Sequence, residues 1–141
     1  MLDWSKSYEL YLGLSEKQRL SIGRKSHEIL VKEIENLSEE EFLRSTMYVM
    51  SFAPFMSLSE EHGREEYLFF KGATGYKDNY ENFCYAAKKG KNEKVGQFLQ
   101  IYFQKLGGEV LTAFLSFALA LLTIKGEITD DEKALIEKIH G

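Results

Sequence analysis

The stretch Val110–Ile124, VLTAFLSFALALLTI, is the longest uncharged run in the chain, and charged residues bound it on both sides. Drawn as a helix, it has apolar rows on all sides, formed by Leu111, Leu115, Ala118 and Leu122 and by Phe114, Phe117 and Leu121. Such a helix either spans a membrane or forms the buried centre of an all-helical fold. Its length of about 22 Å is less than a hydrocarbon core of about 30 Å. The stretch therefore predicts a buried central helix, residues 110–124, and no membrane span.

The composition is that of a folded protein and narrows the function classes. The chain has 141 residues, of which 44% are hydrophobic, enough for a single domain, residues 1–141, with a substantial core. A formal net charge of −4 argues against nucleic acid or an anionic membrane as the partner. Cys84 is the only cysteine, which excludes an internal disulfide and a metal site made of cysteines. The first residues, MLDWSKSYELYLGL, lack the signal-peptide pattern, so we expect a cytoplasmic protein.

Capping patterns mark the starts of several helices. A Ser, Thr or Asp is followed three residues later by Gln or Glu at Ser15–Gln18, Ser38–Glu41, Asp78–Glu81 and Thr129–Glu132. Asn92 is a further cap candidate. Pro54 predicts a helix stop near Ala53, and Gly90 predicts a stop after Lys89. Since no stretch alternates as a strand would, we expect an all-α fold: a compact bundle of about seven helices around the helix 110–124.

The C-terminal segment 120–136, ALLTIKGEITDDEKALI, carries a helix–turn–helix pattern. It resembles the tellurite-resistance TerB-like family through Ala120, Gly126, Ile128, Thr129 and Glu132. The resemblance implies an all-helical fold with an internal duplication, and a link to bacterial stress-response and tellurite-resistance systems. The turn in that family usually carries an aspartate, and acidic residues there are associated with metal binding. This chain has Lys125 at that position, so we carry over the fold and not the metal.

An acidic cluster is the densest group of candidate metal ligands. A helix predicted over 59–71 contains Glu61, His62, Glu65 and Glu66, and residues four apart on a helix share a face. His62 and Glu66 form one such pair and Glu61 and Glu65 the other, so each pair could bind a divalent cation weakly. The alternative is an acidic, solvated helix start favoured by the helix dipole. The sequence does not provide the full ligand set that a zinc site needs.

His27 lies on the apolar face of the helix predicted over residues 15–36. The pair His27-Glu28 would begin a His-Glu-x-x-His zinc motif, but Val31 stands where the second histidine is required. We therefore interpret His27 as a partly buried, hydrogen-bonded core residue. Gly23, one turn away, predicts close helix packing or room for the imidazole ring.

Aromatic residues crowd the region 67–85, and most of them must belong to the core. Tyr76, in a turn, and Tyr85, off the apolar stripe of its helix, are expected to be exposed. Together with Lys77, Lys88 and Lys89 they make a candidate surface for a protein partner. Single-stranded nucleic acid would also suit such residues, but the net negative charge and the lack of arginine there argue against it.

These observations favour a non-enzymatic, cytoplasmic helical module that binds a protein partner. No serine or cysteine nucleophile can be paired with a histidine from the sequence, and no cofactor is indicated beyond a weakly bound divalent cation. The competing hypothesis is a metal-binding protein or metal-dependent enzyme that uses His62 and Glu66. A homodimer held by exposed aromatic residues is a third possibility.

Overall fold

The computed structural model describes residues 4–36, 39–92 and 95–141. Within these residues the chain is all-helical and contains no strand. The eight α-helices are α1 (Trp4–Leu12), α2 (Glu16–Glu35), α3 (Glu41–Ser51), α4 (Gly63–Thr74), α5 (Tyr80–Asn92), α6 (Val95–Leu106), α7 (Gly108–Leu122) and α8 (Asp130–His140). Two short 3₁₀ helices, η1 (Ala53–Phe55) and η2 (Thr123–Lys125), follow α3 and α7. The expected all-α class is confirmed, with eight α-helices where about seven were predicted.

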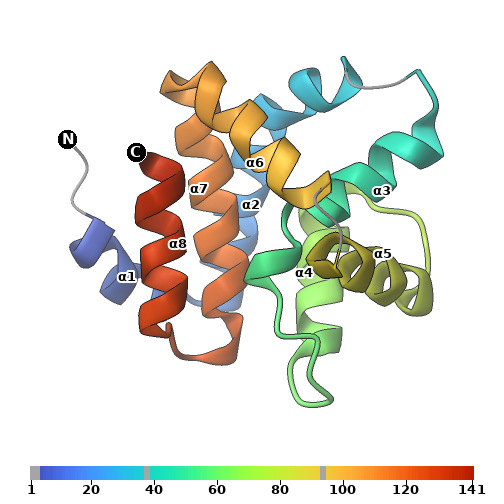
Figure 1. Ribbon diagram of the computed structural model, residues 1–141. Helices are drawn as coiled ribbons and strands as arrows, with labels where there is room; N and C mark the ends of the chain where they lie inside the picture. The colour runs from blue at the N-terminus through green and yellow to red at the C-terminus, as the bar shows by residue number, and fades with distance from the viewer. Residues whose placement is uncertain (1–3, 37–38, 93–94) are drawn as a thin grey trace.

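Helix α2 links the two sides of the molecule. It packs along α7 on one side and against α4 on the other, while α3 packs against α5 and α6. Figure 1 shows α7 and α8 next to each other, with α2 behind α7 and with α3, α4 and α5 on the opposite side of the molecule. The pair α2–α4 therefore joins the N-terminal and C-terminal helices to the middle of the chain.

Helix α7 contains most of the uncharged stretch, whose last two residues, Thr123 and Ile124, lie in η2, and α7 is largely buried. Its buried residues are Ala113, Phe114, Leu115, Phe117, Ala118, Leu119, Ala120, Leu121 and Leu122. The segment 108–125 is long and apolar enough to cross a membrane, and 56% of it is buried inside the molecule. That burial fits the core helix of a soluble protein as well as it fits a span.

Phenylalanine rings connect α7 to the rest of the core. The ring of Phe52 lies 4.7 Å from that of Phe114 and 4.5 Å from that of Phe117, measured between centroids. The ring of Phe103 of α6 also stacks on that of Phe114, with a centroid distance of 4.9 Å. These contacts are within the range in which aromatic pairs stabilise a core beyond simple burial.

Two of the predicted capping boxes are present and one is shifted. Ser15 and Thr129 each accept a hydrogen bond from the backbone three residues later, and the side chains of Gln18 and Glu132 accept from the cap residues in return. Asn79, not Asp78, accepts from the N–H of Asn82 before α5. The predicted cap at Ser38 lies outside the described residues, as does the side chain of Asn92.

Pro54, Gly90 and Gly23 have different roles. Pro54 follows the end of α3 and lies in η1, as predicted. The stop predicted at Gly90 is wrong, because α5 continues to Asn92. A Cβ on Gly90 would lie 2.7 Å from the carbonyl oxygen of Met50, so this glycine lets α5 approach α3 closely. Gly23 has the predicted packing role, because its Cβ would lie 2.8 Å from the ring of Phe69.

Candidate functional site

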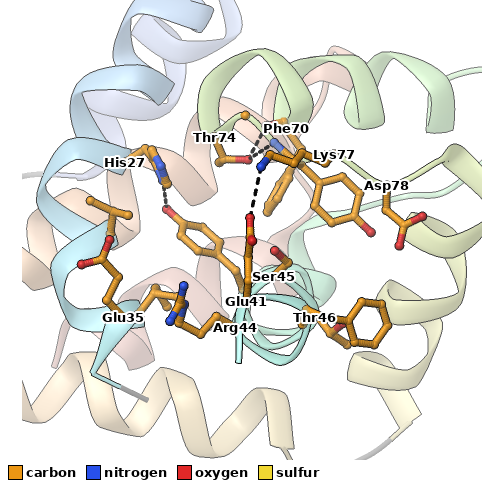
Figure 2. A pocket seen from close by; sticks show the side chains of 16 residues that line it. His27, Glu35, Glu41, Arg44, Ser45, Thr46, Phe70, Thr74, Lys77 and Asp78 are labelled. Carbon is orange, nitrogen blue, oxygen red and sulfur yellow. Dashed lines mark hydrogen bonds and ion pairs between the residues drawn. The ribbon is translucent and has the colours of Figure 1, made fainter. Parts of the chain in front are cut away.

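A cleft of about 520 Å³ opens between the second half of α2, helix α3, the end of α4 and the loop that follows α4 (Figure 2). We call it the His27 cleft. It is lined by His27, Val31, Ile34, Glu35, Glu41, Phe42, Arg44, Ser45, Thr46, Tyr48, Phe70, Thr74, Gly75, Tyr76, Lys77 and Asp78. Its volume lies in the range of about 300–1,000 Å³ that is typical of ligand sites.

The wall of this cleft contains a histidine–tyrosine hydrogen bond. His27 Nδ1 lies 2.9 Å from the hydroxyl oxygen of Tyr48, and a dashed line at His27 in Figure 2 marks this hydrogen bond. Burial raises the pKa of Tyr48. Burial lowers the pKa of His27, and the negative charges of Glu28 and Glu35 oppose that effect only in part. The pair is therefore neutral near pH 7, and the prediction of a partly buried, hydrogen-bonded His27 is confirmed.

Polar and apolar side chains share the rim of the His27 cleft. Lys77 Nζ lies 3.2 Å from Glu41 Oε1, and both side chains are largely exposed. The side chain of Phe42, next to Glu41, is 65% exposed. Thr74 Oγ1 accepts from the backbone N–H of Tyr76 at 3.2 Å, which tightens the turn after α4. An exposed aromatic ring beside charged groups is typical of a binding surface.

The prediction that Tyr76 is exposed is wrong. Its side chain is only 8% exposed, and its ring packs against those of Phe70 at 5.7 Å and Phe83 at 5.9 Å. Gly75 adopts a left-handed conformation with φ of 74°, and the chain after it turns back over the core. Burial, aided by the charge of Asp78, raises the pKa of Tyr76 to about 12. Position in a turn therefore did not imply exposure here.

The other residues of the predicted partner surface are exposed but separate. Tyr85 is 71% exposed, and Lys88 and Lys89 are exposed on the same helix, α5. Lys77 instead belongs to the rim of the His27 cleft. The structure therefore divides the predicted surface into a part on α5 and a part on the cleft.

The acidic cluster does not form the predicted arrangement. Helix α4 begins at Gly63, so His62 precedes the helix and does not share a helical face with Glu66. Glu66 is fully buried, and its carboxylate accepts from the N–H groups of Ser57 at 2.8 Å and Leu58 at 2.9 Å, and from the Ser57 hydroxyl at 3.2 Å. The metal pair of His62 and Glu66 is therefore wrong in its geometry, and Glu66 instead holds the loop before α4.

The remaining members of the cluster lie near solvent. His62 Nε2 lies 3.5 Å from Glu61 Oε1, and His62 Nδ1 lies 3.2 Å from Glu65 Oε1. Both carboxylates are exposed. In the described part of the chain, no group of three or more His, Cys, Asp or Glu side chains is placed to hold a metal ion. Exposed side-chain contacts of this kind contribute little to stability.

The turn between α7 and α8 contains an ion pair in place of an acidic ligand set. Lys125 Nζ lies 2.5 Å from Glu132 Oε2, and both side chains are largely shielded from water. Burial raises the pKa of Glu132, but the hydrogen bond from Lys125 and the bonds with Thr129 lower it more, so the net pKa lies below its usual value. The lysine thus supplies the positive charge at this turn.

A buried arginine was missed by the sequence analysis. The Arg19 guanidinium donates to the carbonyl oxygens of Ala120 at 2.7 Å and Tyr11 at 3.1 Å, and to the Thr123 hydroxyl. The buried residues of α2 are Arg19, Gly23, Ser26, Leu30 and Ile34. The spacing of Arg19 from Gly23 could have placed it on the buried face, since residues four apart share a helical face.

Arg19 lines a second cleft, of about 510 Å³, which we call the Arg19 cleft. It is lined by Leu12, Leu14, Glu16, Arg19, Leu20, Glu65, Leu68, Phe69, Thr123, Ile124 and Gly126. It shares no lining residue with the His27 cleft, although both involve α2 and α4.

Comparison with protein-family models, with curated proteins and with solved structures finds no match to this chain. The function must therefore be argued from the clefts and surfaces themselves.

Proposed function

We propose that this chain is a non-enzymatic, cytoplasmic binding module of the TerB-like type, which engages a protein partner in a bacterial stress-response or tellurite-resistance system. The observation that carries the binding role is the His27 cleft with Phe42 exposed on its rim. A partner side chain inserted there would contact apolar groups such as Val31 and Phe70, and polar groups at the edge. Buried apolar anchors surrounded by polar rims are the usual source of affinity between proteins.

The state of the histidine is compatible with the binding role. His27 Nδ1 is bonded to the Tyr48 hydroxyl, and burial lowers the pKa of the imidazole. The pair therefore fits a structural role in the wall of a binding cleft.

The C-terminal turn supports the TerB-like part of the proposal. Gly126 ends the turn after α7 with φ of 86°, and Thr129 caps α8 with a capping box. These are the two local features that the resemblance implies for these positions. The extensive burial of α7 also agrees with a TerB-like bundle arranged around that helix.

Affinity capture from the cytosol of the native cell tests the binding role. Wild type is compared with Phe42→Asp, which places a charge on the rim of the His27 cleft, and with Tyr85→Asp as a matched control. Both side chains are exposed aromatics, so neither change should unfold the protein. We expect a protein that is recovered with wild type and with Tyr85→Asp and is lost with Phe42→Asp.

Each other result has a defined meaning. Loss with Tyr85→Asp alone would move the partner surface to α5, beside Lys88 and Lys89. Recovery of the same proteins by all three chains would contradict a partner on either surface. Light scattering completes the test, because a wild-type dimer that becomes monomeric on Phe42→Asp would identify a second copy as the partner.

A further inference from the structure

The Arg19 cleft has the lining of a small-molecule site. Six of its eleven lining residues are leucine, isoleucine or phenylalanine, and its volume falls in the range of such sites. Leu68, in its wall, is 61% exposed, and Leu12 is also exposed. Large apolar side chains that remain in water beside a cleft offer surface that a ligand can bury.

The positive charge in this cleft has no acidic partner. Arg19 is only 9% exposed, and within the described residues its guanidinium forms no ion pair. Its three acceptors are two carbonyl oxygens and one hydroxyl, whereas a guanidinium has five N–H donors. The carbonyl of Ala120 lies near the negative end of the α7 dipole and offsets the buried charge only in part. A buried cation in this state favours an added anion.

The charged residues that line the cleft restrict the kind of anion that can bind there. Glu16 and Glu65 also line the cleft, and both are exposed, so water and salt screen their charges. The guanidinium of Arg19 is buried, so the effective dielectric around it is lower and its attraction for a bound anion is screened less. Arg19 matches a ligand with one negative charge, whereas a second negative charge on the ligand has no cationic partner among the residues that line the cleft.

We propose that the Arg19 cleft binds a small molecule with an apolar body and one carboxylate, which pairs with Arg19 while the body contacts Leu12, Leu68 and their neighbours. This site is independent of the partner surface proposed above, because the two clefts share no lining residue.

Titration of the full chain with octanoate tests this site. Isothermal calorimetry measures the affinity, and the backbone amide resonances of α2 and α4 locate the ligand. Octan-1-ol has the same number of carbon atoms without the charge, and octanedioate has a second carboxylate. We expect octanoate to bind at least about tenfold more tightly than octan-1-ol, as a charged hydrogen bond should allow, and more tightly than octanedioate.

A matched pair of variants assigns the binding to this cleft. Leu68→Glu adds a negative charge beside the ligand, whereas Leu10→Glu makes the same change at a side chain that is 66% exposed and lies outside the cleft. We expect Leu68→Glu to weaken octanoate binding at least about tenfold and Leu10→Glu to leave it unchanged. Absence of octanoate binding, equal affinity for octan-1-ol, or unchanged binding to Leu68→Glu would each overturn the proposal.

Discussion

The two clefts lie at opposite ends of the same helix pair and differ in how their polar groups are held. At the His27 end, a neutral histidine is bonded to a buried tyrosine hydroxyl, and the charged groups lie on the rim. At the Arg19 end, the charge itself is buried, and hydrogen bonds to two carbonyl oxygens offset it only in part. Between them, Gly23 brings α2 against Phe69 and Ala73 of α4. One helix pair can therefore carry two chemically different sites, because the close contact at its middle separates them.

The largest loss of stability is expected from a substitution that disrupts the close contact between the two clefts. In Gly23→Leu, the new side chain would overlap Phe69 and the Cβ of Ala73, which lies 2.9 Å from a Cβ at position 23. We expect a loss of about 3 kcal/mol in the free energy of unfolding, at the upper end for overpacking. Urea denaturation followed by circular dichroism measures it.

Ser21→Leu is the control, because Ser21 is exposed on the same helix. A loss for Gly23→Leu no greater than for this control would show that α2 and α4 are not in close contact.

A smaller loss in the free energy of unfolding is expected from a substitution of Arg19. Arg19→Met keeps much of the volume but removes three hydrogen bonds and leaves the Ala120 carbonyl without this donor. We expect destabilisation of about 2 kcal/mol, because hydrogen bonds from a charged group are worth about 1.5–3 kcal/mol. Thermal unfolding measures the change.

The matched control is Arg24→Met, since Arg24 is exposed and donates only to the Gly72 carbonyl at 3.2 Å. Equal effects of the two substitutions would show that the Arg19 contacts add no stability.

Removal of the Tyr48 hydroxyl should have a still smaller effect at the other end. Tyr48→Phe retains the buried ring and deletes the partner of His27 Nδ1. We expect a loss of about 1 kcal/mol, which is the typical net value of a neutral hydrogen bond. Chemical denaturation measures it, and Tyr85→Phe, at an exposed hydroxyl, is the control. A neutral or stabilising result would mean that the bond is not formed in solution.

The smallest expected effect is the contribution of His27 to the pH dependence of folding stability. Because burial lowers its pKa in the folded state, the unfolded chain binds the proton more readily. The stability from neutral His27 is fully present above the unfolded pKa of about 6.5 and is lost as the pH falls through the folded pKa. Melting temperatures between pH 8 and pH 5 should fall less for His27→Gln than for wild type. Parallel pH curves for the two proteins would contradict this assignment.

The local signals in the sequence were reliable where the chain determines its own conformation. The capping boxes at Ser15 and Thr129 involve residues three positions apart, so neighbouring side chains alone specify them. The stop near Ala53 follows from the missing N–H of Pro54 in the same way. The burial of His27 beside Gly23 was also predictable, because helical periodicity relates those positions.

The errors concern residues whose surroundings come from distant segments. Glu66 reads as an exposed acid in a run of acids, yet it is buried under the backbone of residues 57–58. Gly90 reads as a helix stop, yet it allows α5 to approach α3. Tyr76 reads as a turn residue, yet it packs against Phe70 and Phe83. In each case the deciding contact lies across a tertiary interface and leaves no local pattern.

The all-helical character of this chain follows from its local sequence, because helix periodicity and capping act within a few residues of the backbone. The packing of the helices against one another sets which polar groups are buried and where the clefts open. The burial of Arg19 depends on carbonyl oxygens more than one hundred positions away along the chain, at Ala120, as well as on Tyr11 nearby. A cleft is the space left between packed helices, and its position follows from how they meet, which no single segment encodes.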